Sequence, residues 1–145
     1  MTYLLDTNII QAILDNKGKV TKKIERVTER GIEKIFISGI SYYEIMCGLL
    51  TLNLADERHA RKLVKFKNFC DTFDLLLLDK KDIFDKAAEI YALLPKGVTI
   101  ELADLLITSI ANSHNFILVS DDQPLIDKVE NLNLHDFEIQ DWLKD

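Results

Sequence analysis

The stretch Thr2-Tyr-Leu-Leu-Asp6-Thr-Asn-Ile-Ile10 decides the fold, because it joins a short apolar strand to an acid and then to the start of a helix. Similar apolar runs recur along the chain, and longer segments with helical spacing of apolar residues separate them. We expect strands over residues 2–5, 35–38, 73–78 and 116–119, with a last edge strand over 137–139. Strands separated by helices pair in parallel through right-handed crossovers, which predicts a three-layer α/β/α fold with a mainly parallel central sheet.

The helices are expected over residues 8–15, 20–30, 41–54, 57–70, 82–94 and 101–113, and a short one begins near Pro124. Pro95 and Gly97 suit the end of the helix over 82–94, because their backbones favour a stop. The chain has only 2 prolines and 5 glycines and no repeat, so no linker divides it. Residues 1–145 therefore predict a single domain.

The composition is that of an ordinary globular protein, with 48% hydrophobic and 29% charged residues in a chain of 145. It excludes disorder and collagen-like repeats. The net charge of −6 argues against binding polyanions by bulk charge alone. The charge is unevenly spread, however: residues 1–69 carry 12 basic and 8 acidic side chains, and residues 70–145 carry 6 and 16. A role with nucleic acid would need local basic faces or a bridging metal ion.

The two cysteines and the start of the chain indicate the compartment. Cys47 and Cys70 form no metal-binding or CxxC motif, so we expect reduced, buried thiols. The start, Met1 to Asp6, has no basic segment and reaches an acid after two leucines, unlike a signal peptide. The longest aliphatic run, residues 75–78, is too short to span a bilayer. We expect a cytoplasmic protein with no membrane partner.

Acidic residues are predicted to meet at one edge of the sheet. Asp6 ends the first strand, and Asp121 and Asp122 follow the fourth. Glu44 is expected in the first turn of the helix after the second strand, and Asp104 lies near the start of the helix that leads to the fourth. The carboxyl ends of parallel strands meet at one edge, where ligands bind. Clustered carboxylates suit Mg²⁺ or Mn²⁺, and such a site suits metal-assisted phosphodiester hydrolysis.

Each acid also has a purely structural explanation as a helix cap. The candidate caps are Asp6 or Asn8, a capping box from Ser41 to Glu44, Asp104 in a first turn, and Asp121 or Asp122 before Pro124. Four caps that all face one edge are less expected by chance than one.

At these positions the sequence resembles the PIN-domain ribonucleases of the VapC toxin type, over nearly its whole length. Tyr3-Leu-Leu-Asp-Thr-Asn-Ile9 is similar to the opening strand and Asp-Thr-Asn motif of that family. Ile37-Ser-Gly-Ile-Ser-Tyr-Tyr-Glu-Ile-Met-Cys-Gly48 and Ala103-Asp-Leu-Leu-Ile-Thr-Ser-Ile-Ala111 resemble its second motif and its Asp-led helix. Leu118-Val-Ser-Asp-Asp122 and the close at Gln140-Asp-Trp142 are similar to its last motifs, although Gln123-Pro124-Leu125 replace the usual basic residue and Phe.

The resemblance implies a PIN-like nuclease domain that hydrolyses RNA as the toxin of a type II toxin–antitoxin pair. By position, the resemblance implies that four catalytic acids bind Mg²⁺ or Mn²⁺: Asp6, Glu44, Asp104 and Asp122. The neighbours that would orient these acids or the metal-bound water are Thr7, Asn8, Ser120 and Asp121. Because Asp121 and Asp122 are adjacent, either could be the fourth ligand, and alignment with the family favours Asp122. It also implies a homodimer and a cognate antitoxin protein.

Basic residues of the first half fall into two groups. One group is Lys17, Lys19, Lys22, Lys23, Arg26, Arg30 and Lys34. In the other, Arg58, Arg61, Lys62 and Lys65 recur at helical spacing along one face. This second face is either an ordinary solvated face or an electrostatic track for RNA phosphates, and both interpretations stay open.

Two rival functions use the same residues. In a haloacid-dehalogenase-type phosphatase, Asp6 would be the nucleophile, but the acid expected two residues later is Asn8, which cannot transfer a proton. In a non-catalytic PIN-like module, the domain would bind RNA or a protein without cutting it. A complete set of four acids argues against the module, because unused buried carboxylates are costly.

Overall fold

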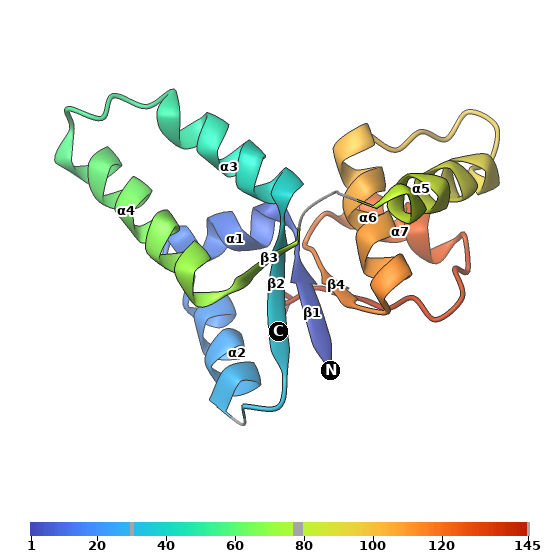
Figure 1. Ribbon diagram of the computed structural model, residues 1–145, viewed down its shortest axis with the longest axis horizontal. Helices are drawn as coiled ribbons and strands as arrows, with labels where there is room; N and C mark the ends of the chain where they lie inside the picture. Colours follow the sequence, from blue (N-terminus) through green and yellow to red (C-terminus); the bar gives the residue numbers. More distant parts are fainter. Residues whose placement is uncertain (30, 77–79, 145) are drawn as a thin grey trace.

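The protein is built around a five-stranded sheet in which every neighbouring pair is parallel (Figure 1). The computed structural model describes residues 1–29, 31–76 and 80–144. The strands are β1 (Thr2–Leu5), β2 (Lys34–Ser38), β3 (Asp74–Leu76), β4 (Ile117–Val119) and β5 (Ile139–Gln140). Their order in the sheet is β3-β2-β1-β4-β5.

Side chains on alternate residues of the strands point to opposite faces of the sheet, and both faces are buried. Tyr3 and Leu5 of β1 pack into the larger apolar core with Ile37 of β2. The intervening Leu4, with Leu118 of β4, packs into a second core on the other face. This double burial explains why the strands are nearly continuous apolar runs in the sequence.

Helices cover both faces, which gives the three predicted layers (Figure 1). The helices α1 (Thr7–Leu14), α2 (Gly18–Glu29), α3 (Gly39–Leu50) and α4 (Glu57–Thr72) pack on the side of the larger core. On the opposite side lie α5 (Lys81–Leu93), α6 (Leu102–His114) and α7 (Gln123–Glu130). The three-layer α/β prediction is confirmed.

The strand order creates a switch point at the centre of the sheet, which the sequence did not predict. From β1 the chain first builds outward through β2 and β3, and later returns to place β4 on the other side of β1. Connections therefore leave β1 and β4 in opposite directions, which opens a crevice at their carboxyl ends. Asp6 and Ser120 are the residues that directly follow these two strands.

The predicted helix over 41–54 is wrong at both ends. The observed α3 begins at Gly39, and its N-cap is Ser38, whose side chain accepts a hydrogen bond from Ser41 N at 3.1 Å. Ser38 is the N-cap because it is the last residue of β2 and α3 follows at once. The capping box expected from Ser41 to Glu44 therefore does not form. Glu44 consequently lies in the second turn of α3 and not in the first.

Other predicted ends shift by a few residues. The strand expected over 73–78 is observed at Asp74–Leu76, and residues 77–79 lie outside the described residues, as does Arg30 at the end of the helix expected over 20–30. The edge strand expected over 137–139 is observed at Ile139–Gln140, where it pairs with β4. The helix α5 ends as expected, because Leu94 precedes Pro95 and adopts an extended backbone.

Cys47 and Cys70 are free thiols, as expected, but the expectation that both are buried is wrong, because Cys47 is exposed on α3 and Cys70 is half-buried on α4. No helix in the part of the chain that the structure describes is long and apolar enough to cross a membrane.

Candidate functional site

Asp6 is the most deeply buried acid of the crevice and is the N-cap of α1. Its side chain is 3% exposed, and its Oδ1 accepts a hydrogen bond from Thr7 N at 2.8 Å. Its Oδ2 accepts one from the Ser120 hydroxyl at 2.8 Å. Burial raises the pKa of Asp6, and these two hydrogen bonds oppose that rise. The cap explanation is therefore correct for Asp6, yet it leaves the carboxylate facing other acids.

Glu44 approaches from α3 and is held by Thr7. Thr7 Oγ1 lies 2.8 Å from Glu44 Oε1 and 3.0 Å from Ser41 Oγ. Ser41 Oγ lies 3.3 Å from the buried hydroxyl of Ser38. Since a hydroxyl has one proton, Thr7 that donates to the carboxylate accepts from Ser41. A row of hydroxyls thus leads from the end of β2 to Glu44. The sequence indicated Thr7, but Ser41 was interpreted as a cap, and its contact across 34 positions has no local signal.

Asp104 lies in the first turn of α6, on the opposite side of the crevice. Its pKa is raised to about 6, chiefly by burial and then by the negative charges of Asp6, Asp122, Glu101 and Glu44. Within the described residues its carboxylate has no side-chain hydrogen-bond partner. Because the negative charges of Asp6, Asp122 and Glu44 all act on Asp104, the four predicted acids share one electrostatic environment.

Asp122 follows β4 and is the N-cap of α7, where its Oδ1 accepts from Leu125 N at 3.1 Å. Its own backbone N–H donates to Ser120 Oγ at 3.2 Å, so Ser120 joins it to Asp6. Asp122 raises the pKa of both Asp6 and Asp104, and Asp121 is not among the main causes of either shift. Asp121 is half-buried, and its Oδ1 has no hydrogen-bond partner in the described structure.

Asn8 differs from the other predicted neighbours of the acids. It is exposed at the start of α1, and its side chain makes no hydrogen bond to any described residue.

A groove of about 370 Å³ runs beside Asp104 and Asp122, and Lys128 also lines it. Lys128 is fixed there by its bond to Thr99 O at 2.7 Å. The sequence alone did not single out this lysine.

The chemistry of the donors fits a hard divalent cation, because four carboxylates from four segments supply only oxygen ligands. They do not converge on a single point: in residues 1–29, 31–76 and 80–144, no three His, Cys, Asp or Glu side chains stand close enough to hold a metal ion. Asp104 and Asp122 line one groove instead, and the charges of Asp6 and Glu44 also act on Asp104. Their mutual repulsion is what a bound cation would relieve.

The four basic residues predicted as RNA contacts are largely engaged within the protein. Lys65 donates to the last carbonyls of α1, Ile13 O at 3.2 Å and Leu14 O at 3.1 Å, and also to Asn16. Lys62 forms an ion pair with Asp15 at 2.9 Å. These bonds fasten α4 to the end of α1.

The other two lie nearer the start of α4. Arg58 pairs with Asp56, the N-cap of the same helix, at 2.9 Å. Arg61 is exposed and donates from Nε to Glu57 O. Among the described residues, Arg61 is thus the member of this face that bonds neither to an acidic side chain nor to another element.

Comparison with known proteins identifies the family. The family model of the PIN domain matches residues 3–131. The chain therefore belongs to the PIN-domain family. Among curated protein sequences, no relative matches it.

Solved structures agree in fold over nearly the whole chain. The chain is similar to VapBC2 from Rickettsia felis bound to a DNA fragment from their promoter, with 22% identity, a TM-score of 0.77, and coverage of 98% of this chain and 99% of that one. It is similar to VapBC-1 from nontypeable Haemophilus influenzae, with 21% identity, a TM-score of 0.79 and 99% coverage of both chains. DNA-bound VapBC from Salmonella typhimurium matches with 21% identity, a TM-score of 0.79 and 98% coverage of both.

Proposed function

We propose that this protein is a divalent-metal-dependent ribonuclease and the toxin of a VapBC-type toxin–antitoxin pair. The observation that carries the proposal is the shared environment of the four acids, in which burial first, and then the charges of the other three acids and of Glu101, raise the pKa of Asp104 to about 6. Such repulsion destabilises the protein unless a cation offsets it. The match to the PIN family and the VapBC structures supports the nuclease and toxin roles.

In this proposal Mg²⁺ or Mn²⁺ is held by Asp6, Glu44, Asp104 and Asp122. The metal supplies positive charge for the phosphodiester and its attacking water. Ser120 orients Asp6 and the start of α7, and Thr7 orients Glu44. Asn8 and Asp121 contribute from the border of the site, through polar contacts to RNA or water.

The two rival functions fit the geometry less well. Both carboxylate oxygens of Asp6 accept hydrogen bonds and the side chain is 3% exposed, which suits a fixed ligand better than the nucleophile of a phosphatase. In a module that binds without cutting, burying the Asp104 carboxylate among other acids would lower the stability of the protein without serving a reaction.

Exposed apolar helix faces support the proposed protein partners, a second copy of this chain and a cognate antitoxin. On α3, Tyr43 and Leu50 are 68% and 57% exposed and lie on one face with Cys47. On α5, Phe84 and Tyr91 are 50% and 65% exposed. Apolar faces of this kind mark interaction sites. We place the assembly in the cytoplasm. Light scattering of the chain alone and with its antitoxin measures both associations.

The test is cleavage of single-stranded RNA by the purified protein with Mn²⁺, with EDTA, and as Asp6→Asn. We expect cleavage only by the wild-type protein with Mn²⁺, and a loss of more than about a hundredfold in Asp6→Asn, since removing even supporting groups of a metal site costs 10–100-fold. Asp74→Asn is the matched control, because Asp74 is an exposed acid in β3. Equal cleavage in all conditions contradicts the proposal, and turnover of a phosphomonoester through an aspartyl-phosphate supports the phosphatase instead.

A further inference from the structure

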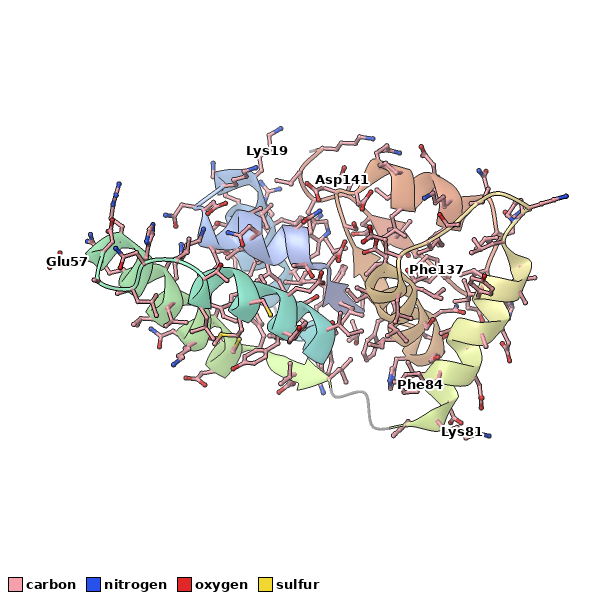
Figure 2. The ribbon with its side chains drawn as sticks, turned by 90° about the horizontal axis from the view of Figure 1, so that it is seen from above. Lys19, Glu57, Lys81, Phe84, Phe137 and Asp141 are labelled. Carbon is pink, nitrogen blue, oxygen red and sulfur yellow. The ribbon has the colours of Figure 1, made fainter. Side chains whose placement is uncertain are left out.

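The helix α2 carries a cationic face that none of the preceding roles uses. Lys19, Lys22, Lys23 and Arg26 recur at the spacing that places residues on one side of a helix. Together they line one shallow groove of about 250 Å³. The buried residues Val20 and Val27 lie on a different face of the helix, which packs on the larger core. Figure 2 shows Lys19 pointing away from the body of the protein into solvent.

Three of these four cations do not serve the stability of α2; only Arg26 lies in the last turn, where a positive charge is favourable. The first turn of the helix contains no acid, and Lys19 lies there instead. The N-terminus of a helix has a positive partial charge, so cations in its first turns are unfavourable. Neighbouring cations on one helix face also repel one another. A local rule broken in this way, with no compensating contact, is typical of a functional surface.

The basic faces of α2 and α4 differ in whether their side chains are free to bind an external anion. On α4, Lys62 and Lys65 are engaged with the end of α1, and Arg58 with Asp56. On α2, by comparison, none of the four cations forms an ion pair or a side-chain hydrogen bond with another described residue. Four adjacent positive charges therefore remain available on α2 for an external anion.

We propose that this α2 face, formed by Lys19, Lys22, Lys23 and Arg26, binds the phosphate backbone of single-stranded RNA and holds the strand for cleavage at the carboxylate site. The inference rests on the proposed nuclease function. The position is suitable, because α1 begins next to Asp6 and leads directly to the turn before α2. The 8 residues of α1 span about 12 Å, so the first turn of α2, with Lys19, lies about one short helix away from Asp6 along this path.

RNA is the occupant that the charge distribution favours. The crevice contains four carboxylates, and residues 70–145 carry 6 basic and 16 acidic side chains, so most of the surface beyond it repels phosphate. A substrate with one negative charge per nucleotide therefore needs a separate row of cations to gain affinity. An apolar partner helix would be opposed by this face, since four lysine and arginine groups would have to lose their hydration.

The experiment compares the wild-type protein with the variant K19Q/K22Q/K23Q/R26Q. Glutamine keeps helix propensity and removes only charge. The matched control, K80Q/K81Q/K86Q/K96Q, removes the same charge from the segment that contains α5. Binding of a long single-stranded RNA is measured in EDTA at salt concentrations from 50 to 200 mM, and KM and kcat are measured with Mn²⁺. Circular dichroism confirms that both variants are folded.

We expect the α2 variant to bind RNA more weakly at low salt and to lose most of its salt dependence. Four phosphate contacts, at a slope of about 0.7 each, correspond to about a fiftyfold loss of affinity over this salt range in the wild-type protein alone. KM should rise by at least about tenfold while kcat at saturating RNA is retained, and the control should match the wild-type protein.

Equal salt dependence in the α2 variant and the control overturns the inference and leaves the nuclease proposal intact. Loss of binding to an acidic antitoxin with unchanged RNA binding also overturns it, and assigns the face to a protein. Absence of Mn²⁺-dependent cleavage by the wild-type protein contradicts the nuclease proposal instead. In that case the binding curves in EDTA still decide whether α2 binds RNA.

Discussion

The two sides of the carboxylate crevice are built in different ways. On the strand side, Asp6 and Glu44 are held by hydrogen bonds from Ser120, Thr7 and the backbone. On the α6 side, Asp104 has no such partner among the described residues, and its pKa is raised to about 6. Burial and repulsion act on both sides, but hydrogen bonds oppose them at Asp6 and none of the described contacts opposes them at Asp104. This difference predicts that substitutions on the two sides have opposite effects on stability.

The largest effect is expected for Asp104→Asn. Its Mn²⁺-dependent cleavage should fall by more than about a hundredfold, because a proposed ligand is lost. Its free energy of unfolding in EDTA at pH 7 should nevertheless rise, because the substitution removes a charge that burial and four neighbouring acids disfavour. Thermal unfolding and RNA cleavage measure both results.

Glu101→Gln is the matched control for this prediction. Glu101 is an exposed acid at the start of the same helix, and we do not propose it as a ligand. It should retain cleavage. A lower stability of Asp104→Asn than of the wild-type protein in EDTA would mean that the Asp104 carboxylate stabilises the fold, and it would contradict the difference between the two sides.

A smaller effect is expected for Ser120→Ala, on the hydrogen-bonded side. Asp6 Oδ2 loses its donor while it stays buried, and Asp122 N loses its acceptor. Leaving such buried groups without partners costs about 1–3 kcal/mol of stability. Cleavage should fall about 10–100-fold, as for other groups that orient metal ligands. Chemical denaturation and cleavage assays check this, with the exposed Ser113→Ala as control. Unchanged stability contradicts the proposed support of Asp6.

The pH dependence provides a third measure of the difference. Folding raises the pKa of Asp104 from 3.8 to about 6, so the folded state binds more protons than the unfolded state between these values. The contribution of this group to stability in EDTA therefore falls as the pH rises from about 4 to 6. Mn²⁺ affinity should instead rise with pH: below pH 6 it should fall about tenfold for each unit by which the pH is lowered, because binding must displace a proton.

Titration calorimetry with Mn²⁺ between pH 5 and pH 8 measures this dependence. In Glu101→Gln the midpoint should shift to lower pH, since Glu101 contributes to the raised pKa of Asp104. A pH-independent affinity would show that Asp104 is not part of the metal site.

The sequence predicted the side of the site that follows the strands better than the rest. Asp6 and Ser120 directly follow apolar runs, so parallel pairing alone placed both at the same edge of the sheet, although not next to each other. The strand order, with β4 beside β1, could not be predicted, because no local pattern specifies which strands become neighbours. The interpretation of Ser41 as a cap was wrong for a similar reason: Ser38 and Ser41 are both good caps, and only the position of β2 decides between them.

The basic face of α4 shows the same limit. Helical spacing correctly placed Lys62 and Lys65 on one side of a helix, but spacing does not reveal what that side contacts. In the structure it contacts the end of α1, where lysine stabilises carbonyls at the negative end of the helix.

The smallest effect is expected for Thr7→Val, which tests whether the hydroxyl row matters on the fixed side. Valine keeps the shape and removes the group that lies 2.8 Å from Glu44 Oε1 and 3.0 Å from Ser41 Oγ. Glu44 is exposed, so water can replace the lost donor, and cleavage should fall by no more than about tenfold, the lower end for such groups. The exposed Thr72→Val is the control. A loss as large as that of Ser120→Ala would mean that Glu44 depends on Thr7 as strongly as Asp6 depends on Ser120, and the strand side would then act as one hydrogen-bonded unit.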